Sequence, residues 1–191
     1  MTDKKNTSAR LQLLFIAAVF FVPLLVAAVL YYSGNLVPPA GRTNNGALLE
    51  PVINLSDELP DSPLYKLGAG HWLLVYENSG NCDTRCEEAL YSIRQMRLML
   101  GKEMDRVRRI FLHGETPPDT VLLAAEHQGL ISLQDDDLSD LITQKIPSSL
   151  AAGGYFLIDP HTNLVMYFHP GIDPSAMVED IKRLLKLSRI G

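Results

Sequence analysis

Residues 71–101 have the sequence HWLLVYENSGNCDTRCEEALYSIRQMRLMLG, and the expected fold follows from them. Trp72–Tyr76 is a short apolar run of the kind found in buried strands. A polar turn follows at residues 77–81, and from Asp83 to Leu100 apolar residues recur at helical spacing until Gly101 interrupts the pattern. The stretch therefore predicts a buried strand, a turn with two cysteines, and an amphipathic helix.

The sequence after this stretch predicts the remainder of a small α/β domain. Apolar runs predict strands at Val107–Leu112, Tyr155–Ile158 and Leu164–Phe168, with a hairpin turn at Asp159–Asn163, and helical patterns occupy Thr120–His127, Asp137–Gln144 and Pro174–Ile190. The first two strands and their crossover helix would form a right-handed parallel unit. With the terminal hairpin and the last helix, this order predicts a thioredoxin-like domain over residues 67–191.

The N-terminal region predicts a membrane anchor. Leu11–Leu30 contains 20 residues without a charge, enough to cross the ~30 Å hydrocarbon core as a helix. Aromatic residues extend the segment to Tyr32 and no convincing cleavage site follows, so we expect an uncleaved transmembrane helix at residues 11–32. The basic residues before it place residues 1–10 in the cytoplasm and export the remainder of the chain. In a bacterial host, this predicts a single-pass inner-membrane protein with a periplasmic C-terminal domain.

Residues 33–66 predict a tether between the anchor and the domain. The segment contains five prolines, several Gly and Asn residues, and no sustained period. Its apolar pairs Leu48–Leu49 and Val52–Ile53 could dock on the domain.

The composition excludes several classes of protein. The 191 residues include 47% hydrophobic residues, too many for a mainly disordered chain. A formal net charge of −5 argues against a nucleic-acid-binding protein, which would need an excess of basic residues. Two cysteines are too few for a disulfide-dense scaffold or a four-thiolate zinc site.

Cys82 and Cys86 are the main candidate functional residues. They lie where the first predicted strand passes into the first helix, and two cysteines four residues apart on a first helical turn would share one face. The positive end of the helix dipole favours a thiolate there. Such a pair can bind a soft metal such as Cu(I), cycle between dithiol and disulfide, or form a static disulfide, and inert thiols are a further alternative.

His113 is a candidate third metal ligand. Two parallel strands end at the same edge of a sheet, so His113 after the second strand would approach the cysteines after the first. The alternative is a loop histidine that is hydrogen-bonded or solvated. We expect His71 at the opposite edge, His161 in the hairpin turn and His169 beyond it, all out of reach of the cysteines. His127 is expected at a solvated helix end.

Two charged clusters have structural interpretations. Asp135–Asp137 is expected to cap the helix that follows rather than to bind a hard cation. Arg106, Arg108 and Arg109 indicate a solvated entry to a strand rather than an anion site.

The chain resembles the Sco/SenC family at its cysteine pair and at its predicted hairpin. The matching residues are Cys82, Cys86, Glu87, Glu88, Leu90 and the runs Tyr155–Pro160 and Leu164–Phe168. Sco/SenC proteins are membrane-anchored, thioredoxin-like copper-site assembly factors for cytochrome c oxidase. The resemblance therefore implies Cu(I) as the metal, and oxidase subunits or their assembly factors as partners.

Three elements of the Sco/SenC pattern are not matched. The family's copper-ligand histidine, about five residues before the hairpin aromatic, has no counterpart at Leu150–Ala152. The acidic motif after the second strand is replaced by Leu112–Pro117. Pro147 lies too far from Tyr155 to be the thioredoxin proline that directly precedes the hairpin strand.

Three functional hypotheses follow. The preferred one is a membrane-anchored assembly factor for a respiratory cytochrome c oxidase, which acts through Cys82 and Cys86 on copper or on copper-site thiols. The second is a tethered periplasmic thiol–disulfide oxidoreductase in which Cys82 attacks and Cys86 resolves. The third is a non-catalytic thioredoxin-like scaffold that binds oxidase subunits.

Overall fold

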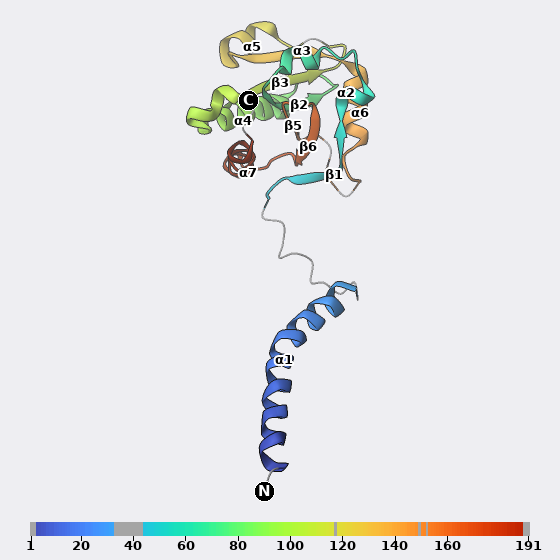
Figure 1. Cartoon of the computed structure of the whole chain (residues 1–191). Coiled ribbons are helices and arrows are strands. Elements are labelled where there is room, and N and C mark those ends of the chain that lie inside the picture. Colours follow the sequence, from blue (N-terminus) through green and yellow to red (C-terminus); the bar gives the residue numbers. More distant parts are fainter. Residues whose placement is uncertain (1–2, 33–43, 117, 149, 152, 189–191) are drawn as a thin grey trace. The chain divides into compact units, whose positions relative to one another are not determined.

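The computed structural model describes residues 3–32, 44–116, 118–148, 150–151 and 153–188. The chain forms two compact units, Met1–Thr43 and Asn44–Gly191. In the first unit, α1 (Asp3–Tyr32) contains a window of 21 residues, Arg10–Leu30, with a mean hydropathy of 3.0 and no buried residue (Figure 1). At 1.5 Å per residue this window is about 31 Å long, which matches the hydrocarbon core. The expected helix is therefore confirmed as one N-terminal candidate transmembrane helix.

The second unit is built on a mixed sheet of six strands in the order β1-β6-β5-β2-β3-β4. The strands are β1 (Ala47–Asn54), β2 (Trp72–Asn78), β3 (Val107–His113), β4 (Leu130–Gln134), β5 (Tyr155–Ile158) and β6 (Asn163–Phe168). Strands β2, β3 and β4 are parallel, whereas β5 is antiparallel to both β2 and β6. The predicted parallel unit and hairpin are thus confirmed. Because of these directions, the ends of β2, β3 and β6 and the start of β5 share one edge of the sheet.

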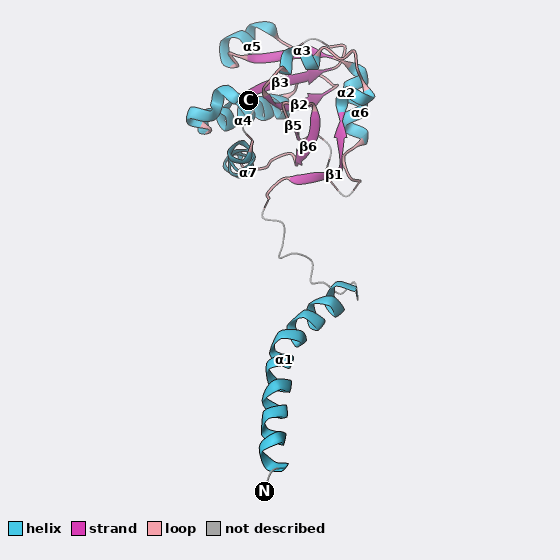
Figure 2. Cartoon of the chain, in the orientation of Figure 1, coloured by secondary structure: helices cyan, strands magenta, loops and turns pink. Residues whose placement is uncertain are grey.

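Helices cover both faces of the sheet, as Figure 2 shows. One face carries α4 (Thr84–Met99) and α7 (Pro174–Leu187), and the other carries α2 (Leu55–Glu58), α3 (Leu64–Gly68) and α6 (Asp136–Gln144). The 3-10 helix η1 (Gly101–Arg106) leads from α4 to β3, and α5 (Thr120–Glu126) connects β3 to β4. Alternate residues of β2 supply the two cores, since Leu74 and Tyr76 face α4 and α7 while Leu73 and Val75 face the opposite layer. The result is the predicted α/β thioredoxin-like fold.

The tether expected at residues 33–66 is corrected by the structure. Residues 33–43 lie outside the described residues, but residues 44–66 belong to the domain, where β1 forms an edge strand paired with β6. Pro51 lies inside β1, and proline is tolerated in a strand only at a sheet edge or a bulge. The register also shifts between Leu48 and Ile53. These two irregularities removed the alternating pattern by which a strand is recognised, so the prediction of a tether there was wrong.

A buried carboxylate holds the start of β1 against α7. Asp180 is 2% exposed and accepts hydrogen bonds from the backbone N–H groups of Asn45 (2.7 Å) and Gly46 (2.8 Å). At the other end of β1, the N–H of Leu55 donates to the carbonyl oxygen of Thr162 (2.9 Å). The strand is therefore attached to the domain at both ends.

The region between the helices predicted at Thr120–His127 and Asp137–Gln144 contains a further strand. Residues 130–134 form β4, which lies parallel to β3 at the second edge of the sheet. Asp135 then caps α6, since its carboxylate accepts the N–H of Leu138 (3.1 Å) and the hydroxyl of Ser62 (2.6 Å). The predicted capping role of this acidic cluster is confirmed.

Candidate functional site

The cysteine pair lies at the edge of the sheet where β2 and β3 end. The turn after β2 is held by the side chain of Asn78, which accepts the N–H of Gly80 (3.1 Å). Gly114, just after β3, approaches this turn so closely that an added Cβ would lie 2.5 Å from the backbone oxygen of Ser79. The loops after the two strands therefore pack directly against each other.

Cys82 and Cys86 are joined by a disulfide, with their Cα atoms 5.0 Å apart. Asp83 is the N-cap of α4, so only Cys86 lies in the first turn and Cys82 lies just before the helix. The expectation that both cysteines occupy the first turn is corrected in this respect. Cys82 is partly exposed, whereas Cys86 is 1% exposed and belongs to the core beneath α4. Cys82 is therefore the more accessible residue of the pair.

Two charged residues, Asp83 and Arg85, lie next to the disulfide and form an ion pair (3.5 Å). Its carboxylate accepts the N–H groups of Cys86 (3.1 Å) and Arg85 (3.1 Å). The hydrogen bond from Cys86, assisted by the charge of Arg85, holds the pKa of Asp83 below its usual value. Asp83 thus stays charged beside Cys82 and occupies N–H groups that would otherwise stabilise a thiolate.

A groove of about 760 Å³ opens beside the disulfide. Asn81 and Asp83, the two neighbours of Cys82 in the chain, line it together with the first turns of α4. The opposite wall comes from the loops before β5 and after β6, through Gly153, Pro170 and Gly171. Neither cysteine itself lines the groove, which therefore adjoins the disulfide through the chain neighbours of Cys82.

Two buried tyrosines form the aromatic part of this groove. The rings of Tyr76 and Tyr155 lie 5.7 Å apart, centroid to centroid. Burial, with smaller contributions from Tyr155 and Asp83, raises the pKa of Tyr76 to about 12, and burial also raises the pKa of Tyr155. Both phenols are therefore neutral at physiological pH, and the groove presents uncharged aromatic surface next to an acidic residue.

His113 ends β3 on the same face of the sheet as the cysteines. Its ring lies 5.7 Å from that of Phe111, which stacks on Tyr76 at 5.9 Å. Nδ1 of His113 is 2.8 Å from the carbonyl oxygen of Gly114. A carbonyl oxygen can only accept, so Nδ1 carries the proton and Nε2 of the neutral ring keeps its lone pair. Within the described residues, however, no group of three His, Cys, Asp or Glu side chains could hold a metal ion, so the third-ligand role of His113 stays a prediction.

Two family models match the sequence. The model described as a transmembrane-like, thioredoxin-like, C-terminal domain matches residues 72–188, and the model described as a transmembrane-like, N-terminal domain matches residues 8–34. The chain belongs to this transmembrane-like, thioredoxin-like family. The sequence matches no curated protein.

Several solved structures share the fold of this family member. Yeast Sco1 is 17% identical, with a TM-score of 0.52 over 65% of this chain and 85% of Sco1. Copper-bound ScoI from Arabidopsis thaliana is 14% identical, with a TM-score of 0.50 over 65% and 89% of the two chains. A SCO1/SenC family lipoprotein from Bacillus anthracis is 14% identical, with a TM-score of 0.50 over 63% and 84%. The domain therefore has a Sco-like thioredoxin fold, which confirms the resemblance seen in the sequence.

The loop before β5 has Gly154, and not the proline of the thioredoxin pattern, directly before the strand, and the contacts of this loop explain the glycine. Tyr167 donates from its hydroxyl to the carbonyl oxygen of Ala151 and accepts the N–H of Gly154 (3.0 Å). A Cβ on Gly154 would lie 2.0 Å from the backbone oxygen of Phe168, so only glycine fits immediately before the strand. This loop forms part of the groove wall. Its role was not predicted, although the two adjacent glycines directly before the apolar run of β5 were an available signal.

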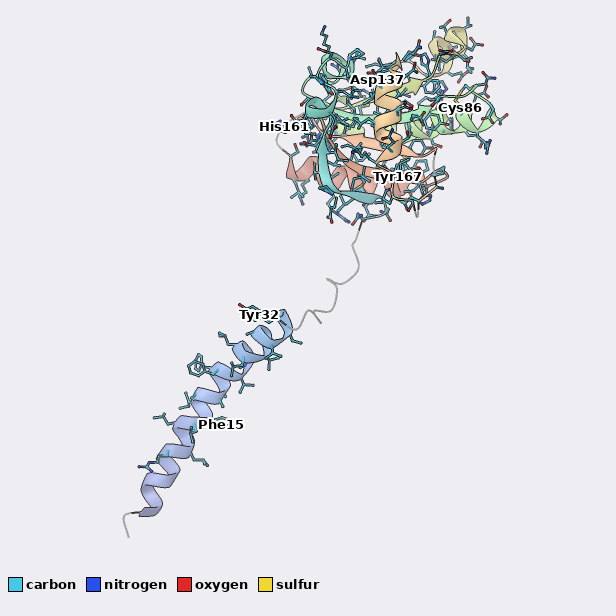
Figure 3. All side chains as sticks on the ribbon, turned by 90° about the vertical axis from the view of Figure 1, so that its right-hand side faces the viewer. Phe15, Tyr32, Cys86, Asp137, His161 and Tyr167 are labelled. Carbon is cyan, nitrogen blue, oxygen red and sulfur yellow. A yellow bond between two sulfur atoms is a disulfide. The ribbon has the colours of Figure 1, made fainter. Side chains whose placement is uncertain are left out.

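His127 was expected at a solvated helix end, but it is buried, with an exposed fraction of 6%. The other three histidines differ in the edge of the sheet at which they lie. His71 precedes β2 and so lies at the opposite edge, and His161 lies on the other side of the domain from Cys86 in Figure 3. His169 follows β6 and therefore lies at the same edge as the cysteines, directly before Pro170 of the groove wall. The antiparallel return of the hairpin brings it there, which the order of strands along the chain did not indicate.

Glu77 was not singled out by any sequence pattern. Its carboxylate is buried at the end of β2 and accepts hydrogen bonds from the hydroxyls of Ser139 (2.8 Å) and Ser79. These contacts link the turn before Cys82 to α6. Glu77 therefore positions the turn that carries the reachable cysteine.

Proposed function

We propose that this protein is a bacterial inner-membrane assembly factor for a respiratory cytochrome c oxidase, and that its periplasmic domain reduces a disulfide at the thiols of an oxidase copper site. The observation that carries the proposal is the Cys82–Cys86 disulfide beside the groove, with one sulfur reachable and the other buried. The Sco-like fold and the N-terminal anchor favour an oxidase as the client, because Sco/SenC proteins assemble oxidase copper sites. The basic residues Lys4, Lys5 and Arg10, which precede the apolar run within α1, favour a cytoplasmic N-terminus.

The reaction is a thiol–disulfide exchange in two steps. In the reduced protein, the thiolate of Cys82 attacks one sulfur of the client disulfide, which forms a mixed disulfide and releases the first client thiolate. The thiolate of Cys86 then attacks Cys82, which forms the Cys82–Cys86 disulfide and releases the second client thiolate. Two electrons pass to the client, whose released thiolates take up protons lost by the two cysteines. A separate dithiol donor must reduce the pair again.

The charge of Asp83 supports the reducing direction. A dithiol whose thiolate is strongly stabilised is an oxidant, because its reduced form is favoured. Here Asp83 occupies the N–H groups of Cys86 and Arg85, and its carboxylate is paired with the Arg85 guanidinium (3.5 Å), so neither these N–H groups nor the guanidinium is free to stabilise a thiolate of the pair. The disulfide form of this pair is therefore more stable, relative to its dithiol form, than the disulfide form of such oxidants. We expect a reduction potential between about −230 and −300 mV. This is lower than the potential of strongly oxidising thiol–disulfide proteins and higher than that of inert structural disulfides.

Capture of the client through single cysteine variants tests the proposal. Cys86→Ser leaves the reachable Cys82 without its resolving partner, so the full chain should accumulate a mixed disulfide with the client. Cys82→Ser is the matched control, because it removes the reachable sulfur and leaves only the buried one. Equal capture by both variants, or by neither, would contradict the mechanism. Normal oxidase maturation in Cys82→Ser/Cys86→Ser would instead favour a non-catalytic scaffold.

Binding of Cu(I) as cargo by the reduced pair is the second candidate function. Two thiolates suit a soft ion such as Cu(I), and the Nδ1–H hydrogen bond of His113 leaves Nε2 as a lone-pair donor on the same face of the sheet. Titration of the reduced full chain with Cu(I) against a competing chelator tests this function. Binding tighter than micromolar is expected if copper is handled, and its absence would remove the copper function. Unchanged affinity in His113→Ala would remove His113 as the third ligand.

A further inference from the structure

A second polar cavity lies near the C-terminal half of α4, away from the cysteine pair. It has a volume of about 340 Å³ and lies between α4, β3 and the connection from α5 to β4. Its polar lining consists of Arg94, Arg97, Arg109, Glu126 and Gln128. Three guanidinium groups against one carboxylate make this cavity cationic in a chain whose formal net charge is −5.

Arg109 is the residue that distinguishes this cavity from an ordinary surface depression. Arg109 was expected to be solvated, but α4 and the chain after α5 cover it, and it is only 2% exposed. Its Nη2 donates to the carbonyl oxygen of Gln128 (2.6 Å). Its Nε and Nη1 are both buried and have no hydrogen-bond partner among the described residues. A buried charge with unpaired donors is unfavourable, so an acceptor is needed at this point.

Arg106, expected in the same solvated cluster, provides the contrast within the chain. Its guanidinium donates to the carboxylate of Glu103 (3.0 Å) and to the carbonyl oxygens of Leu185 (3.0 Å) and Ser188 (3.0 Å). An arginine with a structural role is thus paired by the fold itself. Arg109 receives one carbonyl oxygen and is left with two unpaired nitrogens.

The other two arginines of the cavity increase its positive potential. Arg97 donates to the carbonyl oxygen of Val107 (3.0 Å) and to Asp105 (3.2 Å), and Arg94 contacts the Glu126 carboxylate (3.3 Å). Burial, followed by the charges of Arg97 and Arg94, lowers the pKa of Arg109 to about 10. Glu126 is the only acidic residue among those lining the cavity in the described chain. An anion at this position would therefore meet three guanidinium groups, of which Arg97 is already paired with Asp105 and Arg94 with Glu126.

We propose that this cavity binds a small soluble oxyanion through a phosphate or carboxylate group held between Arg109, Arg94 and Arg97. Guanidinium groups match the planar or tetrahedral oxygens of such anions and bind them with several donors at once. Arg109 forms the buried part of the lining and supplies positive charge, and the partly exposed Arg94 and Arg97 form the entrance. The site is separate from the disulfide and does not depend on the function proposed for it.

Calorimetric titration of the full chain in neutral maltoside micelles tests this proposal. Sodium phosphate and sodium succinate are the two probes, in a low-salt buffer without other oxyanions. We expect at least one of them to bind with a millimolar or lower Kd. Arg94→Gln should weaken that binding at least tenfold. Arg183→Gln is the matched control, because it also removes an arginine paired with a glutamate on a helix, Glu179 on α7, and should leave the Kd unchanged. No binding of either probe, or equal weakening by both variants, would overturn the proposal.

Glu126→Gln separates an anion site from a merely structural cluster. Removing the carboxylate should tighten binding about threefold or more, because the anion then competes with no internal negative charge. A structural Arg94–Glu126 pair without an anion site predicts no such gain, and an unchanged Kd would overturn the proposal. Arg109→Met should abolish binding, with the fluorescence of Trp72 as the check on folding. If this variant does not fold, the Arg94 and Glu126 variants decide the outcome.

Discussion

Reduction of the Cys82–Cys86 disulfide should weaken the domain only slightly. The two cysteines are separated by four positions, so the bond closes a loop of five residues. For a loop of this size, the loss of chain entropy in the unfolded state corresponds to about 2 kcal/mol at 25 °C. Two cores, one on each face of the sheet, remain intact when the bond is broken. A pair that cycles between dithiol and disulfide requires this, because both states must be folded.

Urea denaturation of the full chain in maltoside micelles measures the effect. Trp72 is the only tryptophan and is buried on β2 in the core beneath α4, so its fluorescence reports on the domain. With a slope of ~2 kcal/mol per molar urea, the reduced protein should unfold about 1 M earlier than the oxidised protein. Cys82→Ser/Cys86→Ser should coincide with the reduced wild type and should not respond to dithiothreitol.

A much larger effect would refute the reasoning. If reduction unfolds the domain, or lowers its free energy of unfolding by more than about 5 kcal/mol, the disulfide is required for folding and the proposed exchange reaction is wrong. If reduced and oxidised proteins unfold at the same urea concentration, the loop-closure argument itself fails.

Three further predictions concern the packing around the site. Asp180→Ala should lower the free energy of unfolding by about 3 kcal/mol in urea denaturation, because the N–H groups of Asn45 and Gly46 lose their buried acceptor, whereas the exposed Asp140→Ala should change it little. Gly154→Ala should lower the free energy of unfolding by about 3 kcal/mol in the same assay, because the added Cβ would clash with a backbone oxygen. Gly80→Ala should lower it much less, because the nearest atom to a Cβ added there is 3.4 Å away. Equal losses in the two variants would contradict this reasoning. Tyr76 should ionise near pH 12 in a difference titration at 295 nm against Tyr76→Phe, and a midpoint near 10 would show that it is not buried. Because the folded-state pKa is raised, the stabilisation by neutral Tyr76 is complete below pH 10 and about 3 kcal/mol is lost as the pH rises to 12.

Local patterns were sufficient to predict the anchor, the unit of β2, α4 and β3, the hairpin and the last helix. Each of these elements carries its own period of apolar residues, and that period reflects burial within a single element. The position of the cysteine pair at the end of β2 followed directly, because the turn and the start of the helix are adjacent in the chain.

Other features depended on contacts between residues that are far apart in the chain. β1 belongs to the sheet because Ala47 and its neighbours pair with the distant strand β6. Arg109 is buried because α4 and the segment after α5 close over it. The difference in exposure between Cys82 and Cys86 likewise arises only when the layers assemble. The same holds for His169, which the hairpin returns to the edge of the groove. A local period records which face of an element is apolar, but not which distant groups will cover it, and burial, charge pairing and access are set by that covering.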